Sequence, residues 1–164
     1  MVGHSNGGAV AIRATALGCI QPSKLVLLAT SGVRDTAGLK RAAIKLVAKT
    51  GKVMTLWLPK STRKKLQKKL YGTVGSDMLI TPELIETFKR TVRQDIQNDA
   101  ASLSIPTLLI YGSQDKATPV ASIGKKLHRL IKGSRLEVID SADHFVHQAQ
   151  PTQVCSLLQD FLKS

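Results

Sequence analysis

The 164-residue chain lacks most of the features that mark secreted, membrane and metal-binding proteins. It has no run of about eighteen apolar residues, and its start lacks the basic-then-apolar layout of a signal peptide. We therefore expect a cytoplasmic protein without a membrane span. The two cysteines, Cys19 and Cys155, form no CxxC pair, which argues against a disulfide framework or a metal site. We expect both to be buried small apolar residues.

Acidic residues are scarce, with 11 Asp and Glu against 24 Lys and Arg, so the net charge is +13. The excess is densest in PKSTRKKLQKKLYG, which has no acid and contains the cations Lys60, Arg63, Lys64, Lys65, Lys68 and Lys69. Such a run is typical of a solvated helix face or of contact with an anionic membrane surface. No aromatic residue is interleaved with these cations and no groove-binding motif occurs, so we expect no nucleic-acid partner.

The chain is 43% hydrophobic and 21% charged, which is typical of one globular domain over residues 1–164. Three apolar runs predict strands, namely SKLVLLAT, IPTLLIYGS and the less apolar SRLEVIDSA. Helical patterns follow the second and third runs, in PVASIGKKLHRLIKG and QPTQVCSLLQDFLKS. Strands that alternate with helices pair in parallel, so we predict an α/β fold with a short parallel sheet flanked by helices.

Between the first two strands lies a long helical stretch, which we interpret as a cap or lid inserted over residues 35–102. Thr81, Pro82 and Glu83 form a helix start signal, and the helix is predicted to run to about Ala100. Apolar residues at loose helical spacing precede it. Three of them are candidates for a substrate pocket, although such a stripe is also typical of a helix core: Met54, Trp57 and Leu58.

The first residues, MVGHSNGGAV, contain the pattern GxSxG at Gly3–Gly7. In a nucleophile elbow a serine occupies a strained turn between a strand and a helix, and small neighbours let the backbone bend. Gly3, Gly7 and Gly8 surround Ser5 in this way. The alternative is a plain glycine turn with an exposed serine.

Two later residues complete a possible catalytic set. Asp115 follows the second apolar run, and His144 follows the third, so both are expected at the carboxyl ends of strands, where open α/β sheets bind ligands. The chain order Ser, Asp, His is the order of the α/β-hydrolase triad. Other residues compete for these positions: His147 as the base, and Asp140 or Asp143 as the acid. We expect His147 to pack and Asp143 to lie too close in sequence to orient His144.

With VGHSNGG, IPTLLIYGSQD and ADHFVHQAQP, the chain resembles the C-terminal part of an α/β-hydrolase of the esterase, lipase and haloperoxidase-like branch. The resemblance implies Ser5 as nucleophile, Asp115 as acid and His144 as base, acting on an ester or similar acyl substrate without a metal or organic cofactor. It also implies that the N–H of Asn6 helps to bind the oxyanion. His4 is a candidate pocket wall or packing residue.

Only MV precedes Gly3, whereas the family resembled has further strands and an oxyanion loop before its elbow. We therefore expect a fragment, a late-start gene product or a chain that has lost catalysis, and one that is inactive alone. The run KLVLLAT is expected to have one unpaired side. Two other hypotheses stay open: a noncatalytic hydrolase remnant, and a basic module that binds anionic surfaces through Lys60 to Lys69.

Overall fold

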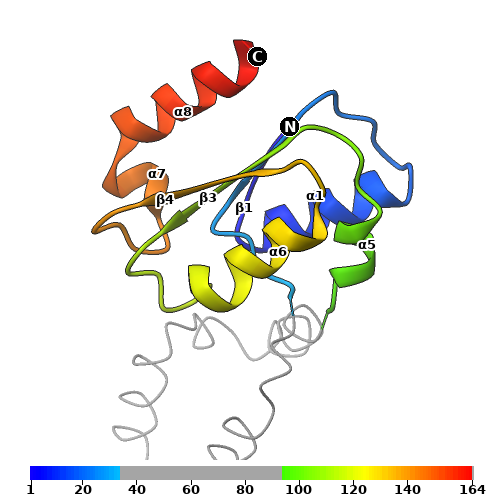
Figure 1. Ribbon diagram of the computed structural model, residues 1–164, viewed down its shortest axis with the longest axis horizontal. Helices are drawn as coiled ribbons and strands as arrows, with labels where there is room; N and C mark the ends of the chain where they lie inside the picture. Colours follow the sequence, from blue (N-terminus) through cyan, green and yellow to red (C-terminus); the bar gives the residue numbers. More distant parts are fainter. Residues whose placement is uncertain (34–93, 164) are drawn as a thin grey trace, which may run out of the picture. The chain divides into compact units, whose positions relative to one another are not determined.

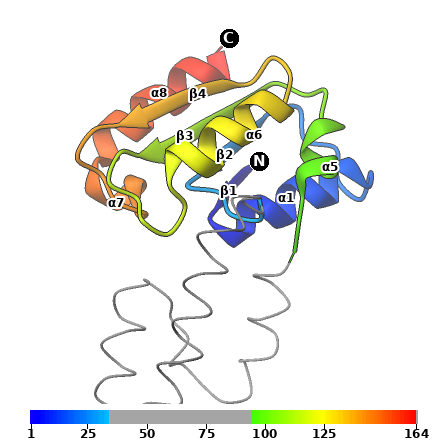
Figure 2. The same ribbon diagram turned by 60° about the horizontal axis from the view of Figure 1, so that its bottom comes forward.

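A computed structural model describes residues 1–33 and 94–163. The chain divides into two compact units, one of Met1–Arg34 with Glu83–Ser164 and one of Asp35–Pro82, and all described residues belong to the first. Its strands are β1 (Val2–His4), β2 (Leu25–Leu28), β3 (Thr107–Gly112) and β4 (Arg135–Ile139). They form one sheet in the order β1-β2-β3-β4, and every neighbouring pair is parallel (Figures 1 and 2).

Helices cover both faces of this sheet (Figures 1 and 2). On one face lie α1 (Asn6–Ala16), α5 (Gln97–Ala101) and α6 (Lys125–Leu130), the last preceded by a short π-helix, η3 (Val120–Gly124). On the other lie α7 (Val146–Ala149) and α8 (Pro151–Lys163). The α/β class and the short parallel sheet flanked by helices are therefore confirmed.

The apolar runs form two cores because side chains alternate between the faces of a strand. Leu25 and Leu27 of β2 pack with α1, α5 and α6, whereas Val26 and Leu28 pack with α7 and α8. Residues of β3 divide in the same way. Strands that are buried on both faces require near-continuous apolar sequence, which is what β2 and β3 have.

One prediction about the sheet was wrong. The run that contains β2 has no unpaired side, because β1 pairs with it on one side and β3 on the other. The three residues before Ser5 are enough for a strand, because β2 supplies its hydrogen-bond partners: Gly3 lies opposite Leu27, and the amide of Val26 donates to the carbonyl of Met1 at 2.9 Å. Among the described strands, the edges are therefore β1 and β4.

The helix predicted to reach Ala100 is not continuous. Residues 94–96 are not helical, and α5 begins only at Gln97. Ile96 and Ala100 are buried in the core with α1, and Nε of Arg13 donates to Asp99 at 2.9 Å. Residues 96–102 thus belong to the sheet-bearing unit, so the end predicted for the inserted cap, residue 102, is too late. The remainder of the predicted cap, up to residue 93, lies outside the described residues.

Cys19 and Cys155 are exposed, so the prediction that both are buried was wrong. Cys19 follows the end of α1, and Cys155 lies on the outer side of α8, whose buried residues are Val154 and Phe161. In the part of the chain that the structure describes, no helix has the length and apolar character needed to cross a membrane.

Candidate active site

Ser5 stands at the junction of β1 and α1 in a strained backbone conformation. Its φ of 51° and ψ of −119° are unusual for a residue other than glycine. The turn is fixed by hydrogen bonds from the Ser5 amide to the carbonyl of Leu28 (2.9 Å) and from the Ser31 amide to the carbonyl of Ser5 (3.1 Å). These bonds join the turn to the end of the neighbouring strand, as the elbow pattern predicts.

Of the glycines around Ser5, two are required by close packing and one is not. A Cβ on Gly3 would lie 2.7 Å from the Cα of Gly8, and a Cβ on Gly8 would overlap the side chain of Thr30. A Cβ on Gly7 would meet no atom within 4 Å. The last glycine of the GxSxG pattern is thus the least constrained, and its neighbour Gly8 lets α1 approach the end of β2.

The structure brings together the three side chains that the sequence singled out. Nε2 of His144 lies 2.9 Å from Oγ of Ser5, and Nδ1 of His144 lies 2.8 Å from Oδ2 of Asp115. Ser5 follows β1, Asp115 follows β3 and His144 follows β4, so all three lie at the carboxyl ends of parallel strands. The Asp115 side chain is fully buried, while His144 is partly exposed.

The carboxylate of Asp115 is held by its own loop. The amides of Ala117 and Thr118 both donate to Oδ1 at 2.8 Å, and Oγ1 of Thr118 lies 2.6 Å from Oδ2. Burial acts to raise the pKa of Asp115, but the hydrogen bonds from His144 and Thr118 outweigh it and hold the pKa below its ordinary value. The carboxylate is therefore ionised at neutral pH, as an orienting acid must be.

Two other rings contact that of His144, and a third, that of His147, packs against both of them. His4 lies 4.9 Å from it between ring centroids, and Phe145 lies 5.5 Å from it. His147 packs edge-on against His4 at 4.9 Å. Nε2 of His4 lies 3.0 Å from the carbonyl oxygen of His144, so His4 fixes the backbone of the His144 loop. Phe145, which the sequence reading overlooked, is 45% exposed beside the site.

The alternative candidates for the acid and the base have other surroundings. Oδ1 of Asp143 accepts from the amide of Phe145 at 2.9 Å, and Oδ1 of Asp140 accepts from the hydroxyl of Ser113 at 3.0 Å. Nδ1 of the His147 ring is buried without a hydrogen-bond partner among the described residues. In residues 1–33 and 94–163, no group of three or more His, Cys, Asp or Glu is arranged to hold a metal ion.

The loop that carries His144 lies directly on the end of β3. A Cβ on Gly112, the last residue of β3, would overlap the carbonyl oxygens of Ala142 and Asp143. Ser141, just before them, has a φ of 56°. A close contact and a strained turn together set the position of His144 relative to Asp115.

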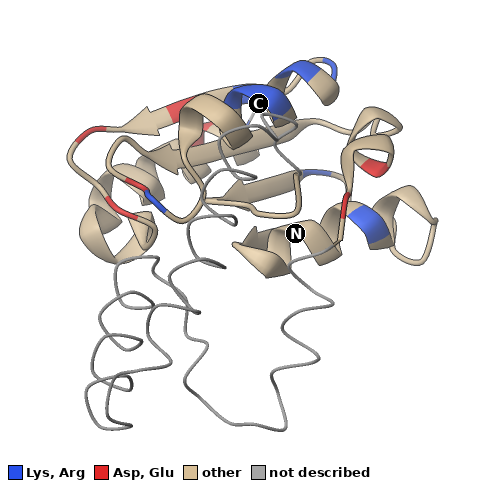
Figure 3. Cartoon of the chain, turned by 90° about the horizontal axis from the view of Figure 1, so that it is seen from below, with Lys and Arg blue, Asp and Glu red and all other residues tan. Residues whose placement is uncertain are grey.

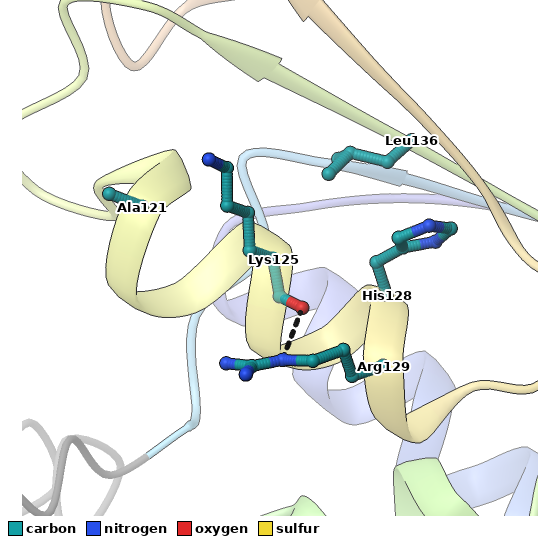
Figure 4. Close-up of a pocket in the computed structure, with 5 residues that line it drawn as sticks. All are labelled: Ala121, Lys125, His128, Arg129 and Leu136. Atoms are coloured by element: carbon teal, nitrogen blue, oxygen red, sulfur yellow. Dashed lines mark hydrogen bonds between the residues drawn. The ribbon is translucent and has the colours of Figure 1, made fainter.

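A surface groove of about 530 Å³ lies apart from these residues, between α6 and β4 (Figure 4). Its lining is Ala121, Lys125, His128, Arg129 and Leu136, none of which belongs to the Ser5–His144–Asp115 cluster. Nδ1 of His128 is already hydrogen-bonded to Ser134 at 2.9 Å.

Several predicted residues lie outside the described residues: the pocket candidates Met54, Trp57 and Leu58, and the basic run Lys60 to Lys69. Attachment of that run to an anionic membrane surface stays a prediction. Thr118 is the residue that sequence reasoning missed at the site itself. Its signal was the spacing in DKATP, where a hydroxyl three residues after an acid and just before proline is typical of a side chain that closes a turn.

A parallel sheet with this serine, histidine and aspartate at its carboxyl edge defines an α/β-hydrolase fold protein. Over residues 1–150 the chain matches the family described as "Serine aminopeptidase, S33", and it belongs to that family. The resemblance to α/β-hydrolases found in the sequence is thereby confirmed.

Individual proteins similar to this chain include hydrolases and esterases. The chain is 27% identical to the uncharacterized hydrolase YugF of Bacillus subtilis (strain 168), over 99% of this chain and 64% of that protein. It is 32% identical to a pimeloyl-[acyl-carrier protein] methyl ester esterase of Neisseria meningitidis, over 51% of this chain and 32% of that protein. Among solved structures, an esterase from Exiguobacterium antarcticum has the same fold, with a TM-score of 0.65 and 19% identity over 99% of this chain and 66% of that one.

The chain spans only part of these proteins. It covers 25% of one curated relative and 64% of another, and 66% of the esterase structure. The match to the family model, over residues 1–150, includes the segments that carry Ser5, Asp115 and His144.

Proposed function

We propose that Ser5, His144 and Asp115 form a catalytic triad and that the protein hydrolyses an ester or a similar acyl substrate. The observation that carries this proposal is the continuous contact from Ser5 Oγ to His144 Nε2 (2.9 Å) and from His144 Nδ1 to Asp115 Oδ2 (2.8 Å). A buried carboxylate that accepts from Nδ1 leaves Nε2 free to take a proton from the serine. A histidine in a merely structural position needs no such alignment.

In the proposed reaction, His144 removes the proton of Ser5 as Oγ attacks the substrate carbonyl. Asp115 holds the Nδ1–H tautomer and stabilises the imidazolium that forms, without itself being protonated. His144 then donates its proton to the departing alkoxide. Water hydrolyses the acyl-enzyme by the same route, with His144 again acting as base and then as acid.

The amide of Asn6 is the proposed oxyanion donor on this chain. Asn6 is the first residue of α1, so its N–H belongs to the free amides of a helix N-terminus, where the helix dipole favours negative charge. The strained Ser5 backbone sets both the hydroxyl and this amide at one end of the helix. The second donor of the family resembled comes from a loop that is not among the described residues.

The substrate class rests on the relatives as well as on the site. One relative is named for a methyl ester and another for an enol-lactone, while the family description names an aminopeptidase. Hydrolysis of an ester, a lactone or a peptide is in each case the transfer of an acyl group to water, which an activated nucleophile can catalyse. We favour an ester over an amide, because the two named relatives cleave carbon–oxygen acyl bonds.

Labelling by a fluorophosphonate probe tests the assignment, because the probe reacts only with an activated serine. The 164-residue chain and the longest product of the same gene that contains it are labelled in parallel. Ser5→Ala is expected to abolish labelling and to lower the hydrolysis of short p-nitrophenyl esters by roughly 10⁴-fold or more in any active form. His144→Ala is expected to have a similar effect.

His147→Ala is the matched control. The residue is a histidine three positions from His144, but its ring packs against His4 and not against Ser5. Its loss is expected to change labelling little. Labelling that persists in Ser5→Ala, or that disappears in His147→Ala and not in His144→Ala, would contradict the assignment. A complete absence of labelling in every form would favour the noncatalytic hydrolase remnant.

A further inference from the structure

Thr118 lies between Asp115 and the end of β2, and its hydroxyl has three polar neighbours. Oγ1 is 2.6 Å from Oδ2 of Asp115, 3.0 Å from the carbonyl oxygen of Ala29 and 3.2 Å from Nδ1 of His144. Both Thr118 and Asp115 are buried. A threonine hydroxyl has a single proton to donate, so these contacts are not equivalent.

The distances determine where that proton lies. A contact of 2.6 Å between a hydroxyl and a carboxylate oxygen has the length of a charge-assisted hydrogen bond. Without a proton between them, two oxygens at this distance, one of them charged, would repel each other strongly. The neutral carbonyl of Ala29 is farther away, so leaving it without the proton costs less.

Oδ2 of Asp115 therefore accepts two hydrogen bonds, one from Nδ1–H of His144 and one from the hydroxyl of Thr118. The second bond withdraws electron density from the oxygen that holds His144. Oδ1 is occupied separately by the amides of Ala117 and Thr118, so it does not compensate.

We propose that Thr118 is a positioning residue that weakens and aims the Asp115–His144 hydrogen bond through its hydroxyl. The catalytic consequence of this inference rests on the proposed function. The effect of Thr118 on the hydrogen bond between Asp115 and His144 does not. Thr118 aims the bond because the amide donor of the same residue fixes Oδ1 while the hydroxyl fixes Oδ2. It weakens the bond because one oxygen is shared between two donors, so His144 returns its proton more readily to the leaving group.

The other ionisable groups near this network are the same in every variant considered. His4 of β1 faces His144 at 4.9 Å, His147 of α7 packs against His4, and the buried Tyr111 of β3 interacts electrostatically with Asp115. Lys116, next to Asp115, is exposed. A change seen on removing the Thr118 hydroxyl therefore reports on the contacts of that hydroxyl, of which the bond to Asp115 is the shortest.

Thr118→Val removes the hydroxyl and keeps the side-chain volume, while Thr118→Ser keeps the hydroxyl. Thr107→Val is the matched control, because Thr107 is a buried threonine at the opposite end of β3 whose hydroxyl bonds only its local backbone, the carbonyl of Ile105. The first measurement is the ¹H NMR resonance of the His144 Nδ1–H, recorded in the cold at neutral pH. It requires no catalytic activity.

In Thr118→Val, this resonance is expected to move downfield, because Oδ2 becomes a stronger acceptor. Thr118→Ser should restore its parent position, and Thr107→Val should leave it unchanged. Loosening of the loop would have the opposite effect, an upfield shift or loss of the signal by exchange. No shift, an upfield shift, loss of the signal, or its absence in the parent chain would overturn the proposal.

The second measurement is the pH dependence of kcat/KM in an active form. The acid limb of Thr118→Val is expected to move to higher pH by roughly one pH unit, the effect of one hydrogen bond to a charged group. A role confined to folding would lower the rate without this displacement. If no form has Ser5-dependent turnover, the proposed function fails, and the NMR result still decides whether Thr118 acts on Asp115.

Discussion

His4 precedes the Ser5 turn and packs among the rings of His144, His147 and Phe145. Burial lowers its pKa below 6.5, and the neighbouring His144 and His147 act in the same direction, against the hydrogen bond to the His144 carbonyl and the charge of Asp115. The neutral ring is thus favoured in the folded chain, where its Nε2–H donates to that carbonyl.

This pKa makes a prediction about stability. As the pH falls through about 6.5, His4 gains a proton in the unfolded chain before it does so in the folded chain, so stability is lost between that pH and the lower folded pKa. His4→Phe removes this loss. The free energy of unfolding in urea, measured at about pH 7.5 and about pH 5.5, should fall less in the variant than in the parent. Parallel falls in both proteins would contradict the prediction.

At the level of single residues, the sequence predicted Ser5, Asp115 and His144 because each follows a strand in the order that the fold requires. Thr118 and Phe145 could not be singled out in this way, because their importance depends on contacts between loops that only the folded sheet brings together. The exposure of both cysteines was also not predictable, since a small sulfur side chain gives no periodic signal of its own.

The start of α1 shows how one element is fitted to the next. Gly7 and Gly8 are consecutive in the first turn of the helix, yet only Gly8 faces β2, where a Cβ would overlap Thr30. Oγ1 of Thr30 is buried and has no hydrogen-bond partner among the described residues. The helix therefore approaches the sheet closely at Gly8 and is open to solvent at Gly7.

Alanine substitutions at these two positions should have opposite effects. Gly8→Ala is expected to lower the free energy of unfolding by roughly 1–3 kcal/mol, because the core would be overpacked. Gly7→Ala is expected to raise it by about 0.5–1 kcal/mol, because alanine favours the helix and meets open space. Urea unfolding of both variants measures the difference. Equal changes of the same sign would show that the contact with Thr30 does not limit the approach of α1.

At the level of elements, the strands inside the sheet were predictable because burial on both faces demands continuous apolar sequence. Strand β1 was not, because its three residues gain their structure from hydrogen bonds to β2 rather than from their own pattern. The break at residues 94–96 was missed for a related reason. Ile96 continues a helical pattern, but burial of its side chain and a hydrogen bond from its amide to Gly32 place it in a turn before α5.

Across the whole molecule, positive charge is distributed unevenly. Fifteen of the 24 Lys and Arg, but only four of the 11 Asp and Glu, fall between residues 34 and 93. In the remainder of the chain, the numbers of basic and acidic residues are nearly equal. Figure 3 shows both kinds on the described elements, with Lys and Arg in blue and Asp and Glu in red. A net charge of +13 makes copies of the chain repel each other, and this repulsion weakens as salt screens it.

The two edges of the described sheet differ in their protection against pairing. Strand β4 carries Arg135 and Glu137, a partly exposed ion pair of the kind that discourages edge-to-edge contact. Strand β1 carries no charged side chain, and Val2 is 57% exposed. Among the described strands, β1 pairs on one side only. Attraction at this edge is therefore opposed mainly by the overall charge.

We expect the 164-residue chain to self-associate through β1, and to do so more as salt is added, because screening removes the repulsion while backbone pairing persists. Sedimentation velocity at several protein and salt concentrations measures this. Val2→Lys should reduce association by placing a charge on the edge strand. Val10→Lys is the matched control. Val10 is 55% exposed on α1, so this substitution adds the same charge away from β1. Equal effects of the two substitutions, or association that weakens with salt, would exclude the β1 edge as the contact.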